Sequence, residues 1–224
     1  MGIRAFVFDF DGLILDTESP MRRSWQEVFG EHGLVLPDRT WAMLLGSSVD
    51  PPELYEFLES HLGHPVDRAE LRERRMKREL ELLDENSPLP GVRELIHETQ
   101  RAGLRRAVAS SSDHAWVDGL LQKHRLLSMF DEVVCSDDVV RIKPSPDLYL
   151  EAVRRLGVLP NEAIAFEDSL HGVVAAKKAG LLCVAVPHPI ARCLAFDEAD
   201  LVVSSIGDRS LAQYLGWASA LTER

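Results

Sequence analysis

The chain has 224 residues, of which 46% are hydrophobic, which is enough for one substantial core and a smaller second domain. Its 25 basic and 36 acidic residues give a formal net charge of -11, a balance that argues against nucleic acid or an anionic membrane surface as a partner. No stretch approaches the roughly 18 uninterrupted apolar residues of a membrane span. The first residues do not have the pattern of a signal segment, so we expect a cytoplasmic protein.

The first third of the chain changes from strand to helix. The apolar run at 3–8 predicts a buried strand, whereas residues 21–32, 40–45, 53–62 and 67–83 have helical periodicity with no strand candidate between them. A cluster of helix breakers, Asn-Ser-Pro-Leu-Pro-Gly, follows at 86–91. We therefore expect a core domain formed by residues 1–18 and 86–224, with residues 19–85 inserted as an all-helical domain.

Beyond this cluster, strands and helices alternate to the end. We predict strands at 106–109, 132–135, 163–166, 183–186 and 201–203, and helices at 91–102, 114–124, 146–156, 170–179 and from 210 onward. This alternation predicts right-handed crossovers and an α/β fold with a doubly wound, mainly parallel sheet. The sequence Pro-His-Pro at 187–189 predicts only a loop. The three cysteines are too few and unsuitably spaced for a disulfide framework or a zinc site.

The end of the first strand carries the strongest chemical signal. It delivers Asp9 and Asp11 into a glycine turn at Gly12, and like charges this close are costly unless a metal or a reacting group uses them. Three later segments follow apolar runs or lie close behind them: the serine cluster at 110–112, the Lys-Pro pair at 143–144 and the acidic pair at 167–168. Because the carboxyl ends of neighbouring parallel strands meet at one crevice, we expect these four segments to form one site.

These residues resemble, in order and spacing, the four motifs of the haloacid dehalogenase superfamily. The matching positions are Asp9-Phe10-Asp11-Gly12 with Asp16-Thr17, Ser110, Lys143-Pro144, and Glu167-Asp168-Ser169 with Gly172. The resemblance covers essentially the whole chain and is to the phosphatase and phosphomutase members with a helical cap, the branch that includes beta-phosphoglucomutase. It implies a Rossmann-like core, a helical cap and chemistry on a phosphate ester.

The first and fourth motifs suit nucleophilic chemistry. Asp9 suits the role of a nucleophile that forms an aspartyl phosphate, and Asp11, on the same side of the extended chain, suits the general acid and base. Attack on an anionic phosphoryl group needs a cation, for which Mg²⁺ is the natural choice. The resemblance implies that Asp9, Asp168 and the backbone carbonyl of Asp11 bind it, with Glu167 in or near that shell. The alternatives are a solvated turn at 9–11 and helix capping at 167–168.

The second and third motifs suit phosphate binding. Ser110 resembles the superfamily's phosphoryl-binding hydroxyl, to which Ser111 adds a donor, and Lys143 would offset the negative charge of the transferring group. A turn serine and a solvated loop lysine are the alternatives. Thr17 either orients the turn that carries Asp11 or begins a helix.

The predicted cap carries the candidates for substrate recognition. By position, Gly46, Ser47 and Ser48 match the cap loop that reads the substrate in relatives, with an ordinary turn as the alternative. The basic run at 72–78 is interpreted as a solvated, self-paired face, from which Arg75 or Lys77 could reach a second anionic group. Trp25, Trp41 and Phe57 are interpreted as core residues at helical spacing. Beta-phosphoglucomutases have arginine and histidine where this chain has Val49 and Met21, which weakens a mutase assignment.

The leading hypothesis is a Mg²⁺-dependent phosphomonoesterase that hydrolyses a small phosphorylated metabolite, either a sugar phosphate or a phosphoglycolate-like compound. A phosphosugar mutase of the beta-phosphoglucomutase type is the alternative enzyme, and a catalytically silent ligand-binding or regulatory protein is the alternative of another class. We expect no nucleic-acid or membrane partner, and a monomer, with a homodimer left open.

Overall fold

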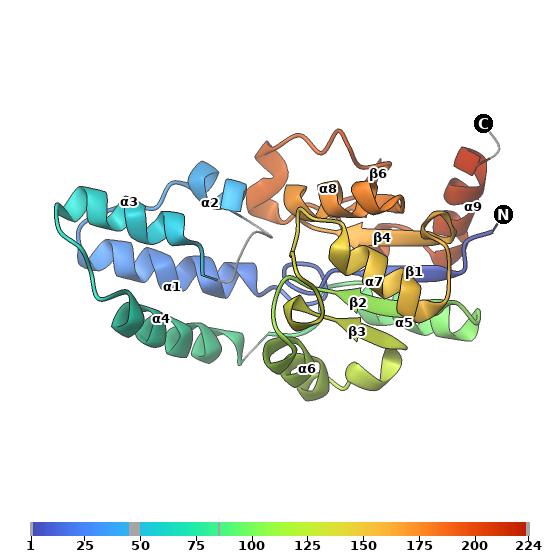
Figure 1. Ribbon diagram of the computed structural model, residues 1–224, viewed down its shortest axis with the longest axis horizontal. Coiled ribbons are helices and arrows are strands. Elements are labelled where there is room, and N and C mark those ends of the chain that lie inside the picture. The colour runs from blue at the N-terminus through green and yellow to red at the C-terminus, as the bar shows by residue number, and fades with distance from the viewer. Residues whose placement is uncertain (1, 45–49, 85, 223–224) are drawn as a thin grey trace.

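A six-stranded sheet forms the centre of the molecule in the computed structural model, which describes residues 2–44, 50–84 and 86–222 (Figure 1). The strand order is β3-β2-β1-β4-β5-β6 and every pairing is parallel. The strands are β1 (Ala5–Phe8), β2 (Arg105–Ala109), β3 (Glu132–Val134), β4 (Ala163–Glu167), β5 (Leu182–Ala185) and β6 (Leu201–Val202). The predicted doubly wound parallel sheet is confirmed.

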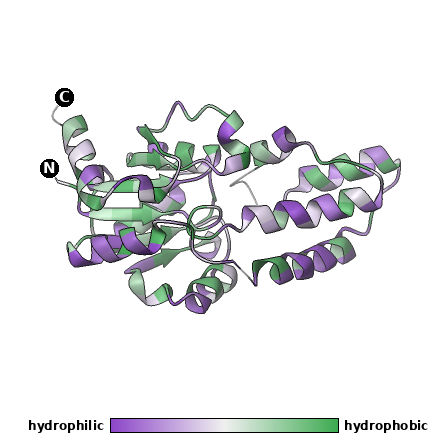
Figure 2. Cartoon of the chain, turned by 180° about the vertical axis from the view of Figure 1, so that it is seen from behind, coloured by the Kyte–Doolittle hydropathy of each residue, from purple (hydrophilic) through white to green (hydrophobic). Residues whose placement is uncertain are grey.

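Helices cover both faces of this sheet. They are α5 (Val92–Arg101), α6 (His114–Lys123), α7 (Asp147–Leu156), α8 (Leu170–Ala179) and α9 (Leu211–Thr222). Ala5 and Val7 of β1 pack in the apolar cluster that includes residues of α7 and α8, whereas Phe6 and Phe8 pack in the cluster that includes α5, α6 and α9. Side chains of a strand alternate between its two faces, so β1 is buried on both sides, as a central parallel strand should be. In Figure 2 the sheet is coloured mainly as hydrophobic, which agrees with a buried position.

Four helices lie between β1 and α5 in the sequence. They are α1 (Glu18–Glu31), α2 (Asp38–Leu44), α3 (Pro52–Leu62) and α4 (Arg68–Leu83), and they extend beyond the carboxyl ends of the strands (Figure 1). Trp25 and Trp41 are buried, and the Trp25 ring meets Tyr55 edge to face with 4.9 Å between ring centroids. The interpretation of these tryptophans as core residues is confirmed. None of the described helices is long and apolar enough to cross a membrane.

The structure differs from the predicted elements mainly at their ends. Helix α1 begins at Glu18, three residues earlier than predicted, and so contains Pro20 in its first turn. Proline is tolerated there because the first amide groups of a helix have no partner within it. The predicted loop at 187–189 leads into a short 3-10 helix, η4 (Pro189–Cys193), which contacts α2. Gly46, Ser47 and Ser48 lie outside the described residues.

We predict that stability depends on pH through His114, the first residue of α6. Its Nε2 lies 2.8 Å from Asp138 and its Nδ1 3.1 Å from Asp118. Burial by itself lowers the pKa of His114, but the hydrogen bonds and charges of these carboxylates outweigh it and raise the pKa. Because the unfolded value is about 6.5, this stabilisation is complete below that pH and is lost as the pH rises through the folded value.

The change His114→Gln should therefore reduce the free energy of unfolding more at pH 5.5 than at pH 9, by less than about 1 kcal/mol for these partly exposed groups. Urea denaturation at both pH values measures this. His97→Gln, at an exposed position of α5, is the matched control. An equal loss at both pH values for His114→Gln would show that the ion pairs do not stabilise the fold.

Candidate active site

Three strand ends meet at the centre of the sheet. Asp9 directly follows β1, Ser110 follows β2 and Glu167 ends β4. Phe8 is in register with both Val108 of β2 and Phe166 of β4, so the strands end at the same level. Strands β1 and β4 are the neighbours at which the strand order reverses, which is where open α/β sheets form their binding crevice.

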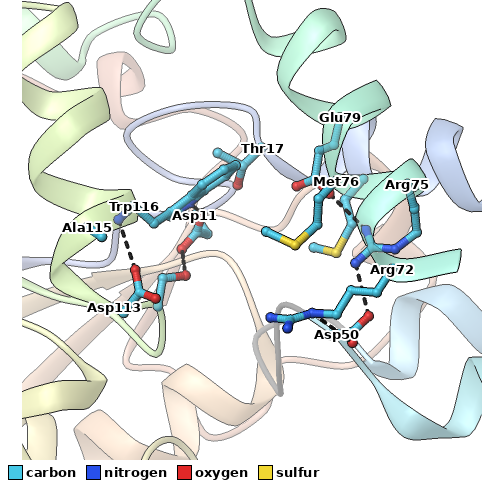
Figure 3. Close-up of a pocket in the computed structure, with 12 residues that line it drawn as sticks. Asp11, Thr17, Asp50, Arg72, Arg75, Met76, Glu79, Asp113, Ala115 and Trp116 are labelled. Atoms are coloured by element: carbon cyan, nitrogen blue, oxygen red, sulfur yellow. Dashed lines mark hydrogen bonds and ion pairs between the residues drawn. The ribbon is translucent and has the colours of Figure 1, made fainter. Parts of the chain in front are cut away.

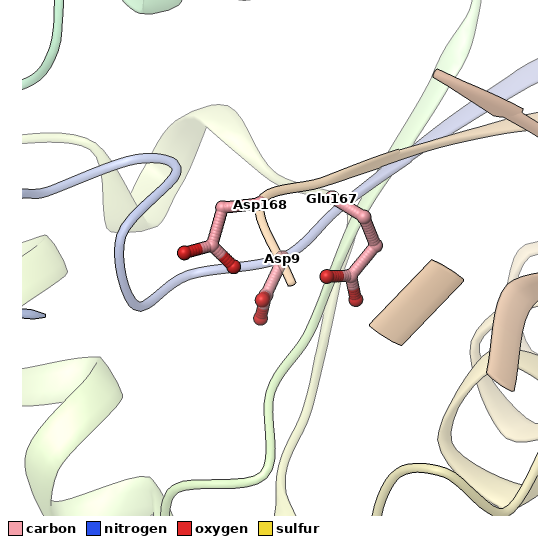
Figure 4. A group of neighbouring side chains, drawn as sticks. All are labelled: Asp9, Glu167 and Asp168. Carbon is pink, nitrogen blue, oxygen red and sulfur yellow. The ribbon is translucent and has the colours of Figure 1, made fainter. Parts of the chain in front are cut away.

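A cluster of buried carboxylates occupies this position. Asp9, Glu167 and Asp168 point toward one another (Figure 4), and each contributes an oxygen that lies within 4.8 Å of the other two. All three side chains are almost completely buried. Burial, and after it the charge of Glu167, raises the pKa of Asp9 well above its ordinary value. Burial, and after it the charge of Asp9, does the same to the pKa of Asp168.

Lys143 supplies the cation that the fold itself places in this cluster. Its Nζ lies 2.6 Å from Oδ1 of Asp9 and 2.7 Å from Oε1 of Glu167. Burial by itself would lower the pKa of Lys143, but the charges of Asp9 and Glu167 outweigh it and raise the pKa above its ordinary value. The buried ammonium therefore stays charged, and the alternative of a solvated loop lysine is wrong.

The two carboxylates of the acidic pair differ in their partners. Glu167 accepts hydrogen bonds from the hydroxyls of Tyr149 and Ser169 in addition to its ion pair with Lys143. Both oxygens of Asp168 are buried without a hydrogen-bond partner among the described residues. A buried, unpaired carboxylate is costly, and oxygen atoms of this kind are the ligands that Mg²⁺ prefers. Asp9 and Asp168 thus fit a divalent cation, whose charge would favour their ionised forms.

Two glycines leave room for this cluster. A Cβ atom on Gly12, whose φ is +74°, would lie 2.2 Å from Oδ2 of Asp168. A Cβ atom on Gly172, in the first turn of α8, would lie 1.9 Å from Cδ of Glu167. Any other residue at these positions would displace a carboxylate of the cluster.

Asp11 lies apart from the cluster and has different partners. Its Oδ2 accepts hydrogen bonds from Ser112 Oγ at 2.6 Å and Ser110 Oγ at 3.2 Å, and its Oδ1 accepts one from Trp116 Nε1 at 3.0 Å. Ser110, predicted to bind phosphate, therefore donates to Asp11 in this structure. The hydroxyl of Ser111 is buried and has no hydrogen-bond partner within the described part of the chain.

Ser112 was predicted only as part of the serine cluster, without a role of its own, and Trp116 was not predicted. The sequence did contain a signal for Trp116, which is an indole N–H donor in the first turn of a predicted helix that begins just after the serine cluster. In a parallel α/β sheet, the helix that follows a strand begins at the binding crevice.

A cavity of about 290 Å³ opens beside Asp11 (Figure 3). Ser112 and Trp116 line one side of it, and α4 lines the other. Thr17 directly precedes α1 and its backbone carbonyl accepts a hydrogen bond from the amide of Met21, so the alternative that it begins a helix is confirmed by its position. Its hydroxyl caps no helix amide; Thr17 lines the cavity, and this hydroxyl is buried without a hydrogen-bond partner among the described residues.

The basic run on α4 divides into two kinds of residue. Arg74 and Arg78 pair with glutamates of α1 near the surface, and Lys77 is exposed and does not line the cavity. The interpretation as a solvated face fails for Arg75, which is buried, lines the cavity and has its guanidinium 5.0 Å from the centre of the Trp25 ring. Helical spacing places Arg75 on the buried face of α4, together with Leu71 and Glu79, whereas Arg74 and Arg78 lie nearer the surface.

Known proteins resemble this chain along its length. A family model described as haloacid dehalogenase-like hydrolase matches residues 6–186, a range that contains all four motif segments. YhcW of Bacillus subtilis (strain 168) is 40% identical over 95% of this chain and 96% of its own. Hexitol phosphatase B of Escherichia coli (strain K12) is 31% identical over 96% of this chain and 97% of its own. Among solved structures, CbbY from Rhodobacter sphaeroides in complex with xylulose-(1,5)bisphosphate is 33% identical, with a TM-score of 0.76 over 94% of this chain and 98% of that one.

We predict that Gly172→Ala destabilises the protein by at least about 3 kcal/mol, because displacing Glu167 leaves the buried Lys143 with a broken ion pair. Chemical denaturation monitored by circular dichroism measures this. Gly216→Ala is the matched control, since Gly216 also lies within a helix and its Cβ would meet no atom within 4 Å. That variant should be neutral or more stable by roughly 0.5–1 kcal/mol. Equal stabilities of the two variants would contradict the tight packing of Gly172 against Glu167.

Proposed function

The chain belongs to the haloacid dehalogenase-like hydrolases, and from this premise we propose that it is a Mg²⁺-dependent phosphomonoesterase of small phosphorylated metabolites. It is an enzyme of the phosphatase type, as its relatives' names indicate. One observation supports the dependence on Mg²⁺ and the reaction at phosphorus. The buried Asp9 pairs with Lys143 at 2.6 Å, and beside it lie the two oxygens of Asp168, which have no hydrogen-bond partner among the described residues.

Asp9 would act as the nucleophile. Its carboxylate attacks phosphorus, the bond to the leaving oxygen breaks, and an aspartyl phosphate forms that water then hydrolyses. The ion pair with Lys143 keeps Asp9 oriented, and Glu167 holds Lys143 from the other side at 2.7 Å. Lys143, Ser110 and Ser111 would bind the oxygens of the transferring group, where negative charge develops.

Asp11 would act as the general acid and base. It gives a proton to the leaving alkoxide and then takes one from the attacking water, which requires a side chain that both can reach. The three donors around Asp11 place its carboxylate at the edge of the cavity, outside the cluster of Asp9 and Asp168. This position suits a group that meets the leaving part of the substrate.

We assign the magnesium site to the side chains of Asp9 and Asp168 and the backbone carbonyl of Asp11. When bound, the cation would offset the negative charge between the attacking carboxylate and the phosphoryl group. Glu167 lies beside this site, but its two oxygens accept hydrogen bonds from Tyr149 and Ser169. We therefore propose that Glu167 acts mainly through Lys143.

The helices of residues 19–85 would form a cap domain over a core of residues 1–18 and 86–224. The cavity supports this role because α4 of the cap and α6 of the core line it together. A cap that closes over the cavity would exclude bulk water during phosphoryl transfer. Substrate identity would then depend mainly on cap residues.

Product analysis distinguishes the phosphatase from a mutase. With Mg²⁺ and a hexose 1-phosphate, we expect stoichiometric release of inorganic phosphate, because no step of the proposed reaction returns the phosphoryl group to the sugar. Isomerised sugar phosphate without free phosphate would support the mutase instead. A colorimetric phosphate assay with chromatography of the sugar products measures both.

Asp9→Asn is the control for this assay. The replacement is nearly isosteric but a poor nucleophile, so turnover should fall by about a thousandfold or more while the circular dichroism spectrum stays unchanged. Substantial phosphate release by the variant would refute Asp9 as the nucleophile.

Metal binding gives an independent test by thermal denaturation. Mg²⁺ at about 100 times its dissociation constant should stabilise the wild type by about 2.7 kcal/mol. Asp168→Asn should lose this stabilisation, yet be at least as stable as the wild type without metal, because it removes a buried, unpaired charge. Asp11→Asn should keep more of the metal response, since its proposed ligand is a backbone carbonyl. Equal loss in the two variants would contradict this ligand set.

A further inference from the structure

The cavity beside Asp11 contains more negative than positive side chains. Its charged lining residues are Asp11, Asp50, Glu79, Asp113, Arg72 and Arg75. Four carboxylates thus face two guanidinium groups. The remaining lining residues are Thr17, Ser112, Met21, Met76, Ala115 and Trp116, which carry no charge.

Both guanidinium groups are already engaged with carboxylates of the same cavity. Arg75 lies 3.0 Å from Oδ1 of Asp50 and 2.8 Å from Oε2 of Glu79. Arg72 lies 3.3 Å from Oδ2 of Asp50. To bind Arg75, an incoming anion would have to break its buried ion pairs, which costs several kcal/mol. The side chain of Arg72 is 51% exposed, so solvent screens its charge and weakens its attraction for an anion.

No other cation is available along the described lining of the cavity. Lys77 is exposed and does not line it. Lys143 is committed to Asp9 and Glu167 at the phosphoryl site.

Because the cavity lies beside Asp11, we expect it to bind the leaving part of the substrate. The transferring phosphoryl group must contact Asp9, and the proposed acid that protonates the leaving oxygen, Asp11, lines the cavity. The remainder of the substrate must therefore extend from Asp11 toward α4 (Figure 3). There it meets carboxylate acceptors together with the apolar side chains of Met21, Met76 and Trp116.

We propose that the enzyme selects phosphomonoesters whose leaving part is uncharged and hydroxylated, and rejects those with a second phosphate or a carboxylate. This rests on the proposed function and narrows it to sugar or polyol monophosphates, excluding bisphosphates and phosphoglycolate. Hydroxyl groups can donate to Asp50, Glu79 and Asp113, whereas a second anion would face their repulsion in a partly desolvated cavity.

Two pairs of substrates matched in structure test the proposal. Fructose 1-phosphate is compared with fructose 1,6-bisphosphate, and 2-hydroxyethyl phosphate with phosphoglycolate. Burial raises the pKa of Glu79 to about 7, so the assay runs at pH 8, where this carboxylate is mostly ionised, with Mg²⁺ in excess over substrate. We expect kcat/KM to be at least tenfold higher for the neutral member of each pair. Equal or higher values for the charged members would overturn the inference.

A positive charge introduced into the cavity tests whether its excess of carboxylates causes the selectivity. Met76 lines the cavity on α4, whereas Leu80, one turn later, is exposed and does not line it. Met76→Lys should raise the ratio of kcat/KM for the charged member to that for the neutral member at least fivefold. Leu80→Lys adds the same charge to the same helix and should leave this ratio unchanged.

If Met76→Lys and Leu80→Lys have the same ratio of kcat/KM for charged and neutral substrates, the charge of the cavity does not cause the selectivity. If the wild type hydrolyses neutral and charged members equally well, the selectivity is refuted while the phosphatase stands. If the wild type hydrolyses none of the four compounds, the proposed function fails, and the inference that rests on it fails too.

Discussion

The buried ammonium of Lys143 is the interaction on which the site depends. Asp9 and Glu167 end adjacent parallel strands at the same level, so their charges are forced together in a region without solvent. Lys143 lies 2.6 Å and 2.7 Å from them and makes this arrangement possible. Asp168 has no such partner among the described residues, so three carboxylates share one ammonium, and a divalent cation is the natural complement of the two remaining negative charges.

Two aspartates that are two residues apart in sequence have different surroundings. Asp9 points into the buried cluster, whereas Asp11 accepts hydrogen bonds from two serines and a tryptophan beside the cavity. The roles proposed for them, nucleophile and general acid, need different environments, because one must stay ionised and the other must exchange a proton. The glycine that follows Asp11, Gly12, leaves the space that Asp168 occupies.

The sequence predicted the strands and helices closely, because apolar runs and helical periodicity are local properties. The four motif segments were also found, since chemically demanding residues follow strand ends. The contacts among these segments could not be predicted as well from the sequence. Trp116 was missed, and Ser112 was given no role of its own, because their hydrogen bonds to Asp11 depend on where α6 and its preceding loop lie relative to β1. Arg75 was grouped with its solvated neighbours because only the packing of α4 on α1 buries it.

By itself, the sequence determined the α/β alternation, the segments proposed to carry the chemistry, and the family, because each is encoded in residue type and spacing along the chain. Only the tertiary structure decided which carboxylate is left without a partner, how Asp11 is held and that the cations of the cavity are already paired. These properties arise from distances between segments far apart in sequence, and burial and charge pairing exist only after the chain has folded.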